Sequence, residues 1–190
     1  MKATRESNNT ITNELQKVWT PPKHPTIKLN IDATVDDKRG RLGVGVAART
    51  STGKVIACLS SNIHGPLEPT LAEYLAVEQA FVLAEKIKAS NIWIEGDSLE
   101  AIKLIQDTEG DFSIIRLHLK VIKDLMKLLS NNTITHIRRE GNRVAHTIRY
   151  ALHIETQKVW FKELPCFIQT VIRKEMLMCK MDSHYSSVFS

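Results

Sequence analysis

The order of the apolar patterns is the feature that most constrains how this 190-residue chain folds. Near its start, apolar and polar side chains alternate in TIKLNID, and short turns at DDKRG and STG separate this segment from LGVGVAART and KVIACLSSNI. Alternation with a period of two predicts β-strands, and connections this short join antiparallel neighbours. This part of the chain therefore predicts a three-strand antiparallel meander.

The patterns that follow alternate between helix and strand. Apolar residues at helical spacing predict helices over about 71–89, 98–107, 113–129 and 142–157. Between them, NIWIEG and ITHIRRE predict two more strands. Helices that connect strands in this way act as crossovers between parallel neighbours. We therefore expect an α/β fold with a mixed five-stranded sheet, a three-strand antiparallel meander plus two parallel strands, flanked by helices.

The two ends of the chain differ from its middle. Residues 1–22 are expected to form a flexible tail, because ESNNTITNE offers little to bury and the prolines of WTPPKHP disfavour helix and central strand. Residues 23–157 are expected to form one domain. Residues 158–190 are expected to be a C-terminal extension that is partly disordered, especially at CKMDSHYSSVFS.

Composition excludes several classes of protein. The chain has no apolar run near the roughly 20 residues that span a bilayer, and its polar start is unlike a secretion signal. Cys58, Cys166 and Cys179 are odd in number and far apart, which argues against a disulfide framework and a zinc site. We expect an intracellular monomer, in nucleus or cytoplasm. The net charge of +5 is compatible with a polyanionic partner.

Three carboxylates follow the predicted elements in a way that can bring them together. Asp32 and Asp97 come at the ends of predicted strands, and Glu73 lies in the first turn of a predicted helix. Carboxylates that converge repel one another unless a cation lies between them. Mg²⁺ and Mn²⁺ prefer such oxygen ligands, and a pair of these ions about 4 Å apart can hydrolyse a phosphodiester.

Each of these carboxylates also has a local interpretation. In DSLE, Asp97 can cap the following helix with Glu100 at its third position, and TLAE gives Glu73 a similar place in a capping box. Asp32 can simply begin the turn that continues at 36 and 37. For each residue alone, the local interpretation is the stronger one. Considered together, the three carboxylates form a chemically coherent metal site.

An ordered set of motifs resembles a known family. IKLNIDAT, LGVGVAARTSTGKVIA, AEYLAVEQA, IEGDSLEAI and HIRREGNRVAHTIRYAL are similar to the type 1 ribonuclease H domain, in the branch found in plants and in retrotransposon-derived reverse transcriptases. The resemblance covers roughly residues 28–152. It implies hydrolysis of the RNA strand of RNA–DNA hybrids by four carboxylates and two Mg²⁺ ions.

The resemblance assigns three of those carboxylates directly, to Asp32, Glu73 and Asp97. The fourth normally follows an NxxAD pattern, and NRVAH places His146 there. Mg²⁺ strongly prefers oxygen, so His146 would act through a water or as a proton carrier; equally, it can be a tolerated polar residue on an exposed face. Ala33 stands where the family often has glycine.

Basic residues flank the expected site. Arg138, Arg139 and Arg143 surround the loop before the last predicted helix and are candidates for contacts with phosphates. Asn142 is a further candidate for substrate binding, or a simple helix cap.

The leading hypothesis is therefore a divalent-metal-dependent endonuclease acting on RNA–DNA hybrids. A second hypothesis is a ribonuclease H-like module that binds nucleic acid or protein without turnover, and the third is a basic α/β protein whose carboxylates are all caps. A zinc site from His136, His146 and His153 is disfavoured, because nothing completes a recognisable ligand spacing.

Overall fold

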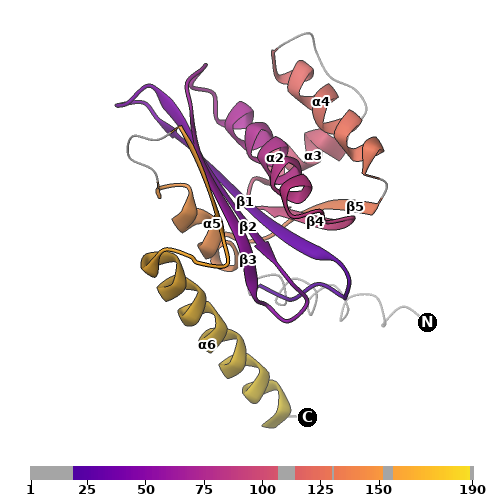
Figure 1. Ribbon diagram of the computed structural model, residues 1–190, viewed down its shortest axis with the longest axis vertical. Helices are drawn as coiled ribbons and strands as arrows, with labels where there is room; N and C mark the ends of the chain where they lie inside the picture. Colours follow the sequence, from indigo (N-terminus) through magenta and orange to yellow (C-terminus); the bar gives the residue numbers. More distant parts are fainter. Residues whose placement is uncertain (1–18, 107–113, 130, 152–155, 189–190) are drawn as a thin grey trace, which may run out of the picture.

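A six-stranded mixed sheet forms the centre of the protein, seen in a computed structural model that describes residues 19–106, 114–129, 131–151 and 156–188 (Figure 1). The strands are β1 (Ile27–Asp36), β2 (Arg41–Arg49), β3 (Val55–Ile63), β4 (Asn91–Gly96), β5 (Asn131–His136) and β6 (Gln157–Phe161). Their order across the sheet is β5-β4-β1-β2-β3-β6. The α/β fold with helices flanking a mixed sheet is as predicted, but the sheet has one strand more than expected.

The pairing directions explain how this order arises. Strands β1, β2 and β3 pair antiparallel, and β4 pairs in parallel with both β1 and β5. The meander and the two parallel strands are thus confirmed. The additional strand, β6, pairs antiparallel with β3 through Ala57–Ser61. It is only five residues long, and the sequence pattern predicts its first residue, Gln157, to be at the end of a helix.

The helices lie on both faces of the sheet (Figure 1). They are α2 (Pro69–Lys86), α3 (Leu99–Gln106), α4 (Ile114–Leu128), α5 (Arg143–Ile148) and α6 (Cys166–Val188). One apolar core joins the sheet to α2, α3 and α4, and it includes Val46 and Ala48. Between them, Ala47 faces the opposite side and packs with Val144 of α5 and Ile168 of α6. Because successive side chains of β2 point to opposite faces of the sheet, this strand contributes to two apolar cores.

Two predicted elements have different limits. The helix expected over 142–157 is shorter, because α5 ends at Ile148 and a new strand begins at Gln157; residues 152–155 fall outside the described part. Strand β5 ends at His136, so Arg139 lies in a short 3-10 turn, η1 (Arg139–Gly141), rather than in a strand. Among the described residues, none of the helices is long and apolar enough to cross a membrane.

The end of the predicted tail is packed against the domain. Trp19 is 5% exposed, and its indole Nε1 donates to Asn30 Oδ1 at 2.8 Å. Its ring also stacks on the Arg49 guanidinium, which forms a buried ion pair with Glu175 of α6. Residues 1–18 lie outside the described part of the chain. Trp19 and α6 therefore meet at Arg49, although the proposed limits of the domain stay a prediction.

Helix α5 lies unusually close to β2 because two glycines make room for it. A Cβ atom at Gly45 would come within 2.4 Å of the Ala145 carbonyl oxygen and 2.5 Å of the Arg149 backbone nitrogen. At Gly43 the nearest helix atom would be the Arg149 carbonyl oxygen, at 3.2 Å. Any side chain at position 45 would have to push the helix away. The glycines thus fix the distance between α5 and the sheet.

Candidate active site

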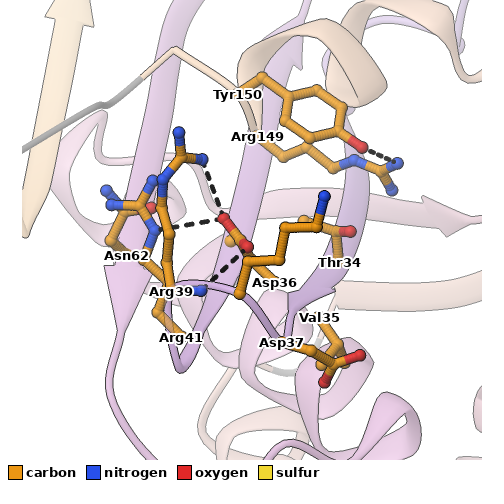
Figure 2. A pocket seen from close by; sticks show the side chains of 11 residues that line it. Thr34, Val35, Asp36, Asp37, Arg39, Arg41, Asn62, Arg149 and Tyr150 are labelled. Carbon is orange, nitrogen blue, oxygen red and sulfur yellow. Dashed lines mark hydrogen bonds and ion pairs between the residues drawn. The ribbon is translucent and has the colours of Figure 1, made fainter.

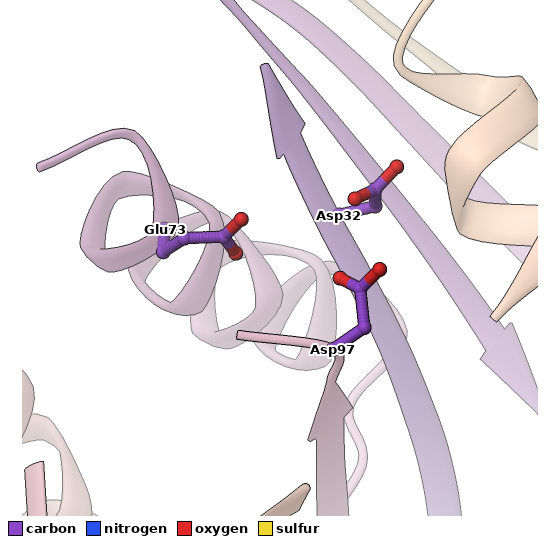
Figure 3. A group of neighbouring side chains, drawn as sticks. All are labelled: Asp32, Glu73 and Asp97. Atoms are coloured by element: carbon purple, nitrogen blue, oxygen red, sulfur yellow. The ribbon is translucent and has the colours of Figure 1, made fainter. Parts of the chain in front are cut away.

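Three carboxylates from three elements converge at one end of the sheet (Figure 3). Asp32 is on β1, Glu73 on α2, and Asp97 follows the end of β4. One oxygen from each lies within 4.8 Å of the others. Asp32 is 2% exposed, and the other two side chains are half-buried. The sequence prediction that these residues come together is confirmed.

Strand pairing explains why the two aspartates meet. Strands β1 and β4 are parallel neighbours, and Ile31 lies opposite Gly96. Asp32 and Asp97 each follow one member of this pair, so both carboxylates emerge at the same level of the sheet. Glu73 reaches the same point from the first turns of α2 (Figure 3).

The local interpretations of the three carboxylates are wrong. The N-cap of α2 is Glu68, whose carboxylate accepts hydrogen bonds from the backbone N–H groups of the first helical turn. Helix α3 is capped by the Ser98 hydroxyl, which accepts from the N–H of Ala101 at 3.3 Å. Asp32 lies inside β1, and it is Asp36 that accepts from the N–H of Arg39 in the turn, at 3.2 Å. The cluster therefore has no explanation in helix capping or turn formation.

Burial and crowding make Asp32 and Glu73 weak acids. Burial raises the pKa of Asp32 to about 7; the charge of Arg149 opposes this rise, and Asp97 adds to it. Burial also raises the pKa of Glu73 to about 8, and the charges of Asp32 and Asp97 add to the effect. A divalent cation between the carboxylates would reverse both effects by favouring the charged forms. The cluster is thus poised to bind a cation.

Arg149 contacts the cluster, a contact that the sequence patterns did not indicate. Its Nη1 donates to Asp32 Oδ2 at 2.7 Å, and it also bonds the carbonyl oxygen of Ala33. Its Nη2 donates to the Tyr150 hydroxyl at 2.8 Å. Arg149 is 8% exposed. The available signal is its spacing three residues after His146, which places both side chains on one face of a helix.

His146 lies at the site, as the motif predicts. Its Nδ1 is 3.1 Å from Asp32 Oδ2, and its ring meets that of Tyr150 edge-on at 5.7 Å. Burial and the charges of Arg149 and Arg139 lower its pKa. A neutral ring with its proton on Nδ1 donates to Asp32 and leaves Nε2 as an acceptor. The side chain is 34% exposed, so part of the ring is accessible to a bound molecule.

The four predicted substrate-binding residues occupy different environments. Asn142 is 1% exposed and donates from Nδ2 to the Ile31 carbonyl oxygen at 2.7 Å, so it holds α5 to β1. Arg139 is exposed, and its charge acts on Asp32 and His146. Arg143 is exposed on α5 but its charge acts on Glu175, away from the carboxylates. Arg138 is half-buried before η1.

A cavity of about 520 Å³ begins at Arg149 and extends along the β1–β2 turn (Figure 2). Lys38, Arg39 and Arg41 line it together with Tyr150. Asp36 accepts from Arg39 at 3.0 Å and lies 3.7 Å from Arg41 Nε. Figure 2 shows these charged groups gathered at one wall of the cavity, opposite Tyr150. The cavity that begins at Arg149, which contacts Asp32, is therefore lined by several cationic groups.

The donor set suits a hard divalent cation. All three converging ligands are carboxylate oxygens, which Mg²⁺ and Mn²⁺ prefer over nitrogen or sulfur. Asp32, Glu73 and Asp97 fit such an ion in chemistry and in spacing. On α5, the position at which the family resemblance implies a fourth carboxylate is occupied by His146.

Several solved structures with the same fold are ribonucleases H. The structure matches ribonuclease H1 from the halophilic archaeon Halobacterium salinarum with a TM-score of 0.60 and 21% identity, covering 65% of this chain and 93% of that one. It matches the N-terminal ribonuclease H domain of a Mycobacterium tuberculosis protein with a TM-score of 0.57 and 19% identity, covering 65% and 89%. It also matches a ribonuclease H1 isolated from compost and solved with an RNA/DNA hybrid, with a TM-score of 0.58 and 19% identity, covering 64% of this chain and 92% of that one.

At these identities the matches establish the fold and do not establish the activity. None of the curated protein sequences is significantly similar to this chain. Residues 30–149, more than half of the chain, match the family described as reverse transcriptase-like. This segment begins on β1 and ends at Arg149, so it contains all three carboxylates. The chain therefore belongs to the reverse transcriptase-like family and has a ribonuclease H-like domain.

Proposed function

We propose that this protein hydrolyses the RNA strand of RNA–DNA hybrids with the help of Mg²⁺ or Mn²⁺. The observation that carries the proposal is the convergence of Asp32, Glu73 and Asp97, with one oxygen of each within 4.8 Å of the others. Local structure offers no other role for them, because Glu68 and Ser98 cap the neighbouring helices. Buried acids that repel one another are costly to a fold and are typical of functional sites.

Different residues of the chain would bind the ion, position a ligand and accept a proton. A bound divalent ion supplies an activated water and stabilises the leaving oxygen of a phosphodiester. Asp32, Glu73 and Asp97 would hold it, and Arg149 keeps Asp32 in place through the 2.7 Å ion pair. His146 would accept a proton at Nε2, because its lowered pKa favours the neutral ring at neutral pH.

The substrate class follows from the surface around the carboxylates. Arg139 on η1, whose charge acts on Asp32, and the arginines that line the cavity beginning at Arg149 supply cationic groups near the site. Such groups attract phosphates irrespective of sequence. A hybrid duplex has a wide minor groove that presents 2′-hydroxyl groups, so it can be recognised by shape rather than by base edges. The solved compost ribonuclease with a bound RNA/DNA hybrid supports this choice of substrate.

A second function is favoured by one specific observation. Arg149 already supplies positive charge to Asp32, and His146 stands where a fourth carboxylate is expected. A site altered in this way is also consistent with a module that binds hybrids without cleaving them. Such a module would bind equally well with Mg²⁺ or with a chelator, whereas the nuclease requires the ion for turnover.

Cleavage of an end-labelled RNA–DNA hybrid tests the proposal. The reaction is followed in Mg²⁺, in Mn²⁺ and with a chelator, using the wild type, Asp97→Asn and the matched control Asp124→Asn. Asp124 lies on α4 in an exposed pair with Lys127, away from the site. Metal-dependent cleavage that is lost only in Asp97→Asn supports the nuclease. Metal-independent binding without cleavage in either ion rejects it and supports the binding module.

A further inference from the structure

We infer that this site holds a single divalent ion, because the Arg149 guanidinium is fixed in the region where a second ion would bind. The inference rests on the proposed function and departs from the pair of ions that the family resemblance implies. It depends on how the two oxygens of Asp32 are used and on how firmly α5 is held.

The two sides of Asp32 face different partners. Figure 3 shows one oxygen of its carboxylate on the side of Glu73 and Asp97, and the other turned away from them. Oδ2 accepts from Arg149 Nη1 at 2.7 Å and lies 3.1 Å from His146 Nδ1. The three-carboxylate cluster can hold one ion on its own side. The α5 side of Asp32 is occupied by a cation and an imidazole.

A second ion needs the side of Asp32 that Arg149 covers. Two ions in such sites lie about 3.5–4 Å apart and share oxygens between them. With the first ion among Asp32, Glu73 and Asp97, the second would share Asp32 and take its remaining protein ligand from α5. There it would meet a guanidinium and a nitrogen ligand, which Mg²⁺ disfavours. Like charges in a poorly hydrated site repel strongly.

Arg149 is anchored on several sides, so it cannot readily swing away. The same guanidinium bonds the Ala33 carbonyl oxygen and the Tyr150 hydroxyl, and it stacks on the Tyr150 ring at 4.7 Å. Its backbone is pressed against Gly45, where a Cβ atom would come within 2.5 Å of the Arg149 nitrogen. Asn142 ties the other end of α5 to β1. The positive charge is therefore a fixed part of the site.

Electron paramagnetic resonance of bound Mn²⁺ tests this inference without using turnover. Two Mn²⁺ ions about 4 Å apart couple magnetically, whereas isolated ions and ions bound to nucleic acid do not. Spectra are recorded with and without a hybrid whose RNA strand carries 2′-O-methyl groups, so that it is not cleaved. We expect an uncoupled signal from one protein-bound ion in both cases.

Variants of the α5 side identify the cause. The double variant His146→Asp with Arg149→Met supplies a carboxylate and removes the cation, and it should bind two coupled ions in the presence of the hybrid. Arg143→Met is the matched control, because that arginine is on the same helix but is exposed and acts on Glu175. It should keep one uncoupled ion. Arg149→Lys keeps the charge and should also bind one ion. If Arg149→Met does not fold, His146→Asp with Arg149→Gln removes the charge and keeps a hydrogen-bonding side chain, and it should bind two coupled ions.

Each outcome separates the inference from the proposed function. A coupled pair in the wild type overturns the single-ion inference and leaves the nuclease intact. A double variant that folds and still binds only one ion overturns the role given to Arg149. A wild type that binds no Mn²⁺, with or without the hybrid, rejects the proposed nuclease and the single-ion site together.

Discussion

Asp32 on β1 lies beside Asp97, which directly follows the parallel neighbour β4, and each is one residue beyond the pair of Ile31 and Gly96. Neither aspartate is used to cap a helix or to close a turn, because Ser98 and Asp36 perform those roles. The two acids are therefore kept together by the register of the sheet at a cost to the fold, and that cost can be measured.

Asp97→Asn should stabilise the metal-free protein. Removing one of the crowded charges relieves the repulsion on Asp32 and Glu73, and we expect a gain of roughly 1 kcal/mol, the scale of one pKa unit. Thermal unfolding with a chelator, compared with Asp124→Asn, gives the difference. A loss of about 1 kcal/mol, as for a missing helix cap, would contradict the prediction.

The stability of the metal-free protein should fall as the pH rises. The pKa values of Asp32 and Glu73 are raised to about 7 and about 8, from ordinary values of 3.8 and 4.5. The folded state therefore binds protons more tightly than the unfolded state, and the stability that these protons give is lost as the pH rises through 7 and 8. Mg²⁺ should raise the melting temperature more at about pH 8 than at about pH 5, because it requires the ionised carboxylates.

Glu73→Gln provides the control for this pH dependence. It removes the group with the higher of the two values, so the melting temperature of the metal-free variant should vary less with pH than that of the wild type. Melting curves over a pH series, with a chelator and with Mg²⁺, measure both effects. An equal slope in the variant would assign the pH dependence to other groups.

Arg139→Ala should weaken the binding of RNA–DNA hybrids without affecting folding. The side chain is exposed on η1, and its charge acts on Asp32 and His146. Loss of one phosphate contact should reduce the slope of log K against log salt by about 1. Fluorescence anisotropy at several salt concentrations measures this slope. Lys127→Ala, on the exposed face of α4, should leave it unchanged.

Asn142→Ala should destabilise the protein by roughly 1–3 kcal/mol, because the buried carbonyl of Ile31 would lose the hydrogen bond that Asn142 donates. This effect differs from that of a substrate ligand, which would lower the affinity for hybrids and leave the melting temperature unchanged. Chemical denaturation of the variant, with hybrid binding measured alongside, distinguishes the two roles. Asn142→Asp is a poor alternative, since an acceptor would replace the donating amide.

Glu95→Gln should be among the most destabilising single changes away from the site. Lys28 is fully buried, and its Nζ donates to Glu95 Oε1 at 2.8 Å and to the Thr20 carbonyl oxygen at 2.8 Å. Removing the negative partner leaves a buried cation without its counter-charge, which costs about 3–5 kcal/mol. Denaturant unfolding tests this, and Asp124→Asn, from an exposed pair, should show almost no change.

The sequence patterns predicted the parts of the fold that depend on order and local periodicity. Three strands with short turns can only pair as a meander, and the helices that follow bring the next strands in as parallel neighbours. That order was enough to place Asp32 beside Asp97. Strand β6 was missed because QKVWF is short and directly follows a helical pattern, so neither its type nor its partner is marked locally.

The contacts of α5 could not be predicted in this way. Arg149 meets Asp32 only because Gly45 lets the helix approach β2, and these residues are distant in the sequence. Asn142 is a residue type that often caps helices, but its side-chain amide donates to the Ile31 carbonyl oxygen on β1. Periodicity reports which face of an element is apolar; it carries no signal for which distant backbone atom a polar side chain will reach.

Strand β6 has a consequence for any shortened version of this protein. It covers the outer edge of β3, which is nine residues long and ends the meander. A chain cut before Gln157 would leave a row of unpaired backbone groups along β3, open to pairing with the same edge of another molecule. In the full chain, the region after the family match therefore protects β3 against self-association. A domain truncated before Gln157 should aggregate more readily than the full chain.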